Sequence, residues 1–310
     1  MLRIALLLSG FIILLLQQYV FTIDIKTQFI IFLSGILLLG VPHGAADLLV
    51  ATRNADSSKK SFSKFKFLSI YVSRLLLFSA TLWFFPLTGN LLFILFAAYH
   101  FGETDLHQFK TDTFLGKLFV ISYGLVILSV ILLHHFEEII PLFQQFKSGK
   151  ENEVFINFID VNRTLLMSIA GIMFFTTTFV YFLRNNSDNI EKGYFLIRFA
   201  VILFILYNLP MLLGFTFYFV VWHSVLSLKN IINYLRDNNS FSQYLIAKQI
   251  IIYSLLAMGG IGLFGLTGFM FINNNAVMGY LFLGLAVLTA PHMQIMHDMY
   301  HTIRTNRTIF

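Results

Sequence analysis

The sequence predicts an all-α integral membrane protein, a polytopic bundle of about ten transmembrane helices within a range of 8–10. Of the 310 residues, 57% are hydrophobic and only 12% are charged, whereas soluble domains carry roughly 25% charged residues. The mean hydropathy is +0.78, and the apolar residues form runs of about 20, the length that crosses a bilayer. We therefore expect a single transmembrane domain over residues 1–310.

Ten apolar stretches are long enough to span the membrane. They are expected near residues 3–22, 27–51, 67–87, 90–108, 117–136, 163–183, 194–211, 213–231, 248–272 and 276–302. Turn-forming residues separate several of them, at Pro86-Leu87-Thr88-Gly89-Asn90, Asn208-Leu209-Pro210 and Asn273-Asn274-Asn275. The region 194–231 also admits one kinked segment with a re-entrant piece. The first stretch resembles a signal peptide, but no small-residue cleavage site follows it, so we expect a retained helix.

The distribution of positive charge predicts the orientation of the bundle. Of the 21 Lys and Arg residues, fifteen fall in loops and helix ends on the side of the N-terminus. The opposite side holds only Lys26, Lys147, Lys150 and Arg163, while Arg74 and Arg198 lie inside spans. Because cytoplasmic loops are rich in Lys and Arg, both termini are expected in the cytoplasm, with the chain in the inner (cytoplasmic) membrane.

The longest outer segment, residues 137–162, carries five carboxylate residues. It is expected to form an extramembrane surface helix or lid on the outer side. No separate soluble domain and no internal repeat are apparent.

Composition excludes several function classes. The absence of cysteine rules out disulfides, zinc–thiolate sites, iron–sulfur clusters and thiol nucleophiles. The net charge of +6 is spread over loops, without a basic patch interleaved with exposed aromatics, so nucleic acid is not an expected partner. The 37 phenylalanines face lipid in the simplest interpretation and line a carotenoid- or lipid-shaped tunnel in the sharper one.

Five histidines lie deep inside apolar stretches: His43, His100, His223, His292 and His297. Ionisable groups are costly in a bilayer and usually retained for a function. Neutral imidazole is also the commonest protein ligand of first-row transition metals. The sequence therefore indicates a metal centre built from histidine.

Depth in the membrane supports a shared site. At 1.5 Å per residue, His43 and His100 lie about 12 Å from the inner ends of their helices, and His223 lies about 9 Å from the inner end of its own. His292 and His297 lie about 16 and 9 Å above the last turn of the final span. All five therefore fall in the cytoplasmic half of the bilayer, although they come from four helices.

Carboxylates follow two of these histidines at helical spacing. Asp47 comes four residues after His43, and Glu103 comes three residues after His100. A ligating imidazole usually donates its second N–H to a carboxylate or carbonyl, so Asp47 and Glu103 are expected to support the ligands. The nearby Gly44 is expected to allow close helix approach or leave room for a ligand.

A structural interpretation applies to each residue taken singly. In this interpretation a lone membrane histidine only forms a hydrogen bond to a neighbouring helix, and Tyr99 and Trp222 are packing residues. The remaining ionisable candidates fit helix ends or membrane interfaces better than the centre itself: His107, His134, His135, His301, Asp105 and Asp298.

At these residues the chain resembles the Brp/Blh family, the bacteriorhodopsin-related membrane β-carotene dioxygenases. The resemblance rests on the order and placement of four segments along nearly the whole chain. They are Pro42-His43-Gly44-x-x-Asp47, His100-Phe101-Gly102-Glu103-x-Asp105, Trp222-His223-Ser224 and Pro291-His292-Met293.

The resemblance implies a non-haem Fe(II) enzyme that uses O₂ to cleave β-carotene at its central 15,15′ double bond. The products would be two molecules of all-trans-retinal, typically supplied to a microbial rhodopsin. By position, His43, His100 and His223 would be iron ligands with a catalytic role. Some members carry a further histidine one turn later, where this chain has Ser227. The fourth ligand is then His292 or His297.

The substrate implied by the resemblance is a hydrocarbon dissolved in the lipid bilayer. Aromatic and thioether side chains near the histidines are expected to hold the polyene: Phe101, Trp222, Met293 and Met296. Another function class is a histidine-lined transporter or proton channel, although no inverted repeat supports it. Membrane di-iron desaturases carry histidine boxes that these spans lack, and a haem protein would show a Soret band.

Overall fold

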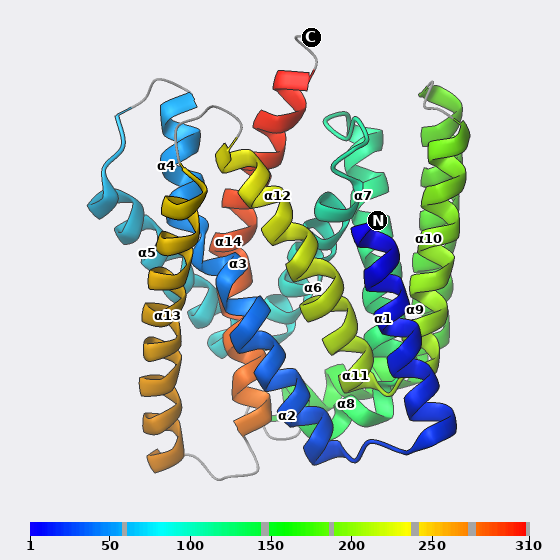
Figure 1. Ribbon diagram of the computed structural model, residues 1–310. Helices are drawn as coiled ribbons and strands as arrows, with labels where there is room; N and C mark the ends of the chain where they lie inside the picture. Colours follow the sequence, from blue (N-terminus) through cyan, green and yellow to red (C-terminus); the bar gives the residue numbers. More distant parts are fainter. Residues whose placement is uncertain (58–60, 144–148, 186–188, 237–241, 272–276, 308–310) are drawn as a thin grey trace.

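The computed structural model describes residues 1–57, 61–143, 149–185, 189–236, 242–271 and 277–307, and these residues form helices without strands. Figure 1 shows the helices running roughly side by side along one axis. The helical segments in chain order are α1 Leu2–Leu15, η1 Leu16–Val20, α2 Ile25–Gly35, η2 Ile36–Gly40, α3 Val41–Ala45, α4 Asp47–Ser57, α5 Lys64–Phe84, α6 Pro86–Leu106, α7 Phe114–Leu128, η3 Ser129–His134, α8 Phe136–Phe143, α9 Gly149–Arg184, α10 Asn189–Asn208, α11 Met211–Phe215, η4 Thr216–Ser224, α12 Val225–Arg236, α13 Gln243–Phe271 and α14 Val277–Arg307.

The prediction of an all-helical membrane protein is confirmed for the described residues. The spans predicted over 67–87 and 194–211 each run past a helix break, at Phe85 and at Leu209-Pro210. Six stretches among the described residues are long and apolar enough to cross a membrane: 2–20, 25–57, 64–84, 114–134, 153–184 and 211–236. The total of about ten spans and the cytoplasmic termini stay predictions. In Figure 1, α1 begins and α14 ends toward the same half of the bundle.

Two of the predicted turns fall within the described residues. Asn208-Leu209-Pro210 ends α10, and the chain reverses into α11, which excludes one continuous kinked helix across 194–231. The turn predicted over 86–90 is wrong, because the break is confined to Phe85. Pro86 takes the first position of α6, where a missing N–H costs nothing and the fixed φ suits a helix. Residues 273–275 lie outside the described residues.

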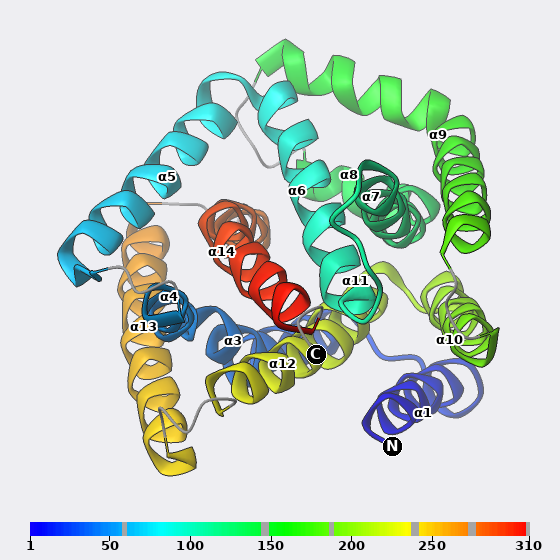
Figure 2. The same cartoon turned by 90° about the horizontal axis from the view of Figure 1, so that it is seen from above.

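The predicted surface segment 137–162 corresponds to α8 and the first part of α9. α8 packs on α9 through a buried cluster of Phe136, Phe155, Ile156 and Ile159. Seen along the bundle, α9 begins by running across it and only then turns along it (Figure 2). Residues 144–148 lie outside the described residues, and a role as a lid stays a prediction.

Helix α14 occupies the centre of one half of the bundle. It packs against α4, α5 and α6, and Figure 2 shows α12 and α13 on its remaining sides. In the other half, α7 packs against α6 and α9. Because α6 contacts both α7 and α14, it joins the two halves, and the largest core cluster lies around α6, α7 and η4.

Four segments, η1 to η4, are π-helical, and two of them adjoin predicted site histidines. Proline at position 42 has no N–H to give to a backbone carbonyl. Just before it, the N–H of Val41 donates to the carbonyl of Ile36, five residues back, so the helix is wider there. His223 lies inside η4 itself. π-Helical turns are rare and frequently mark functional sites.

The contact between α6 and α7 depends on two glycines. A Cβ atom on Gly102 would meet the backbone oxygen of Val120, and one on Gly124 would meet the backbone oxygen of Ala98. The two backbones therefore approach as closely as small-residue interfaces in membranes allow. Gly102, two residues after His100, lies at this close contact between α6 and α7.

We expect Gly124→Ala to lower the free energy of unfolding by about 1–3 kcal/mol, because the added methyl group forces two packed backbones apart. Gly171→Ala in α9 is the matched control, since its Cβ would meet nothing within 4 Å. Thermal unfolding of the detergent-solubilised variants measures the difference. Equal stability of both variants would contradict the close contact.

Candidate functional site

Three of the predicted histidines meet inside the bundle. His43 from α3, His100 from α6 and His223 from η4 each offer a ring nitrogen, and these nitrogens all lie within 4.8 Å of one another. The Nε2 atoms of His100 and His223 are 3.1 Å apart. The three side chains are buried, with relative exposures of 4%, 2% and 0%.

The spacing of these nitrogens fits a metal ion. Imidazole binds a metal at about 2.0–2.1 Å, so two nitrogens on one ion lie at most about 4.2 Å apart. Small side-chain rotations that move the ring nitrogens by a few tenths of an ångström would bring all three within this range. The three donors are all imidazole nitrogens, and the absence of cysteine excludes a thiolate ligand.

Several ring nitrogens of these histidines are unpaired. The Nδ1 atoms of His43, His100 and His223 and the Nε2 atom of His292 are buried without a hydrogen-bond partner. A buried polar atom without a partner costs about 1–3 kcal/mol. Because the rings of His100 and His223 face each other through Nε2, their unpaired Nδ1 atoms are not the donors to a shared ion.

His292 from α14 completes the cluster as a fourth histidine. Its ring centroid lies 5.0 Å from that of His43 and 4.9 Å from that of His100. Its Nδ1 atom lies 2.7 Å from Oδ1 of Asp47, whose Oδ2 accepts a hydrogen bond from the Tyr71 hydroxyl at 3.1 Å. With Nδ1–H held by the carboxylate, the lone pair of Nε2 is available on the cluster side.

Asp47 therefore supports a histidine of another helix, not the one that precedes it in sequence. The helix is interrupted at Ala46, between α3 and α4, so the turn that would align Asp47 with His43 is not continuous. Tyr71 was missed by sequence reasoning, because nothing in the apolar run of α5 distinguishes this residue from a packing tyrosine.

The structure does not bring His297 to the cluster. Its Nδ1 atom lies 2.9 Å from Oε1 of Glu103 and 3.0 Å from the Tyr99 hydroxyl. The same carboxylate oxygen accepts from Nη2 of Arg304 at 3.2 Å. Glu103 thus pairs with α14 groups, not with His100 as its spacing suggested, since it faces the α6–α14 contact.

Asp105 was interpreted as a helix-end or inner-interface group. It does lie one residue before the end of α6, but its surroundings are those of the core and not of an interface. Its side chain is buried, with 2% exposure. It accepts hydrogen bonds from Tyr123, Tyr218 and Trp222. The sequence placed Asp105 in the His100 motif, but no local pattern indicated the donors that surround it.

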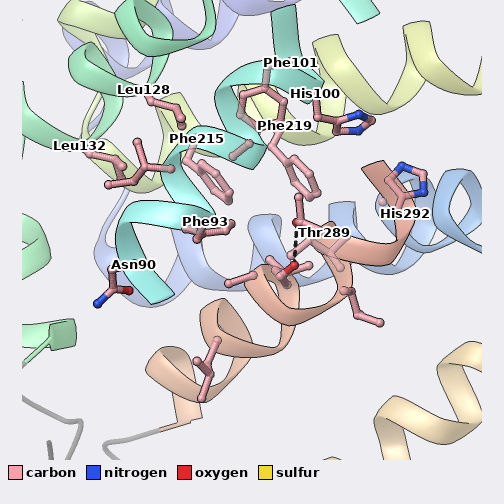
Figure 3. Close-up of a pocket in the computed structure, with 18 of the residues that line it drawn as sticks. Asn90, Phe93, His100, Phe101, Leu128, Leu132, Phe215, Phe219, Thr289 and His292 are labelled. Atoms are coloured by element: carbon pink, nitrogen blue, oxygen red, sulfur yellow. Dashed lines mark hydrogen bonds between the residues drawn. The ribbon is translucent and has the colours of Figure 1, made fainter. Parts of the chain in front are cut away.

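A large apolar cavity adjoins the histidines. It has a volume of about 480 Å³, within the usual range for small-molecule sites. Figure 3 shows His100 and His292 at one end of it and Asn90 and Leu132 toward the other. The wall includes His43, Gly44, Tyr71, Phe93, Phe101, Phe136, Phe155, Met211, Phe215, Phe219 and Thr289.

Of the four side chains predicted to hold the substrate, only one lines this cavity. Phe101 lines the cavity, as does Gly44, whose added Cβ would meet nothing within 4 Å. Trp222, Met293 and Met296 are not among the lining residues. Met296 is buried in the cluster formed by α4, α12, α13 and α14. The aromatic wall instead comes from phenylalanines that the sequence did not distinguish from lipid-facing ones.

Comparison with known proteins gives a family match over most of the chain. Residues 34–300 match the family model described as beta-carotene 15,15′-dioxygenase. The chain is similar to a beta-carotene 15,15′-dioxygenase of uncultured marine bacterium 66A03, with 24% identity over 263 residues, covering 84% of this chain and 90% of the relative. No solved structure matches significantly.

Proposed function

The chain belongs to the β-carotene 15,15′-dioxygenase family, and we propose that it cleaves β-carotene with O₂ at an iron centre held by His43, His100, His223 and His292. It is a carotenoid-cleaving dioxygenase by family and by its curated relative. The iron, the use of O₂ and the exact set of ligands are the proposed part. The observation that carries the proposal is the convergence of three buried imidazole nitrogens within 4.8 Å.

The donor set suits Fe(II). Neutral imidazoles bind divalent iron and leave coordination positions open for other ligands. Bound iron would supply the redox chemistry that activates O₂. His292 is preferred to His297 as fourth ligand because Asp47 holds its Nδ1 atom while Nε2 is unpaired.

The protein's own contribution is to bind, orient and shield the polyene. Phe101, Phe215 and Phe219 line the cavity beside the histidines and provide flat, water-excluding contacts. Holding the substrate in one register selects which double bond faces the centre. Cleavage of the central bond by one O₂ places one oxygen atom in each of two retinal molecules.

A membrane location fits this chemistry, because β-carotene can enter from the hydrocarbon phase without being extracted into water. We propose a multi-pass protein of the inner membrane whose product supplies a retinal-binding rhodopsin. A histidine-lined transporter or proton channel is not favoured, since the comparisons name carotenoid cleavage.

We expect His43→Ala and His100→Ala to abolish retinal formation, because each removes one of three nitrogens that meet at the centre. The assay is expression in β-carotene-accumulating bacteria, with retinal and residual carotene measured by chromatography. His134→Ala is the matched control, since His134 stacks on Tyr207 at 3.9 Å between centroids, away from the cluster. Normal turnover by either of the first two variants would remove that histidine from the site.

We expect His292→Ala to reduce iron affinity far more than His297→Ala, because only His292 borders the three central histidines. Loss of a direct ligand should weaken iron binding at least as much as the 10–100-fold typical when a group that supports a ligand is removed, and the iron content of the purified protein should fall with it. Metal analysis after anaerobic reconstitution measures this. A larger loss in the His297 variant would reverse the assignment.

We expect Gly44→Leu to lower kcat/KM for β-carotene at least tenfold while iron content stays normal, because the new side chain fills cavity space beside His43. Gly171→Leu is the matched control, since its Cβ also meets open space but Gly171 does not line the cavity. Unchanged kinetics in the Gly44 variant would show that the substrate lies elsewhere.

A further inference from the structure

A buried carboxylate connects the elements that carry two of the proposed ligands. Asp105 lies on α6 five residues after His100, and it is 2% exposed. Its Oδ2 atom accepts from the Tyr123 hydroxyl at 2.6 Å and the Tyr218 hydroxyl at 3.1 Å. The indole N–H of Trp222 lies 3.0 Å from both carboxylate oxygens. The carboxylate thus has four close donor contacts from three side chains.

These donors link three separate parts of the fold. Tyr123 belongs to α7, whereas Tyr218 and Trp222 belong to the π-helical segment η4. All three side chains are at most 1% exposed. In a water-free interior their hydrogen bonds to a carboxylate are stronger than at a surface. Asp105 therefore fixes how η4 is rotated relative to α6.

The rotation of η4 sets the position of His223. Trp222 directly precedes His223, so the indole contact with Asp105 fixes the backbone on which the imidazole stands. The ring of Phe101 packs against both Tyr218 and His223, with centroid distances of 5.1 and 4.8 Å.

The charge of the carboxylate also has nearby partners. Arg3 of α1 interacts electrostatically with Asp105, and both Arg3 and Arg198 act on Tyr123. The guanidinium of Arg198 also lies 5.9 Å from the ring centroid of Phe195. Asp105 is thus the centre of a polar network within an otherwise apolar core.

We propose that Asp105 is a positioning residue for the iron centre, acting through Tyr218 and Trp222 on His223. The inference rests on the proposed function, because it concerns how well the imidazoles are arranged for a metal. It predicts that weakening the network lowers the metal affinity by a large factor, while the unfolding temperature of the protein changes little.

The chain offers a direct spectroscopic test. Its two tryptophans are Trp83 and Trp222, and Trp83 is 71% exposed on α5. Trp83→Phe therefore leaves Trp222, the neighbour of His223, as the only tryptophan, and tryptophan fluorescence then reports on this residue alone. Titration of this parent with Fe(II) under anaerobic conditions should quench Trp222 fluorescence, and the midpoint reports metal affinity without any turnover.

In the Trp83→Phe background we expect Asp105→Asn to shift the titration midpoint 10–100-fold, as supporting residues of metal sites typically do. An asparagine places N–H groups where donors already point, so part of the network is lost. Tyr218→Phe removes one hydroxyl only and should shift the midpoint several-fold with an almost unchanged unfolding temperature. It keeps the inference testable if the Asp105 variant fails to fold.

Tyr181→Phe is the matched control for removal of a buried hydroxyl. Tyr181 is 1% exposed and donates to the carbonyl of Lys110, without contact to Asp105. Parent-like affinity in both Asp105→Asn and Tyr218→Phe would overturn the positioning role alone, as would an equal shift in Tyr181→Phe. No metal-dependent signal in the parent would overturn the iron centre and, with it, this inference.

Discussion

The structure depends on the meeting of three imidazoles from α3, α6 and η4 at one point of an apolar interior, with a fourth imidazole from α14 beside them. Buried polar atoms are costly there unless they are paired. The ring nitrogens that meet within 4.8 Å would be satisfied together if they shared one metal ion. For these imidazoles to meet, α3, α6, η4 and α14 must pack around one region of the bundle.

The backbone reaches this arrangement through local departures from regular helix. Pro42 removes a backbone donor, and the helix is wider in the turn just before it, next to His43. η4 is wide over its full length and carries His223. Gly102 and Gly124 allow α6 to lie directly on α7. Each of these features positions a histidine or the helix that carries it.

Polar support for the cluster comes from side chains distant in sequence. Asp47 and Tyr71 hold His292, while Asp105 ties η4 to α6 and α7. The cavity wall beside them is made of phenylalanine and small residues. Rigid polar anchoring on one side and an apolar wall on the other suit a site that holds a stiff, extended polyene next to the proposed metal centre.

The sequence by itself determined the membrane class and the long apolar helical stretches, because composition and run length are properties of a single helix. It also predicted a shared depth for the histidines from the rise per residue. It could not determine lateral packing. Which side of each helix faces its neighbours is decided when the bundle assembles, so only the tertiary structure separated His292 from His297. The same reason explains why Asp47 pairs across helices, why Asp105 is buried, and why the cavity is lined by unexpected phenylalanines.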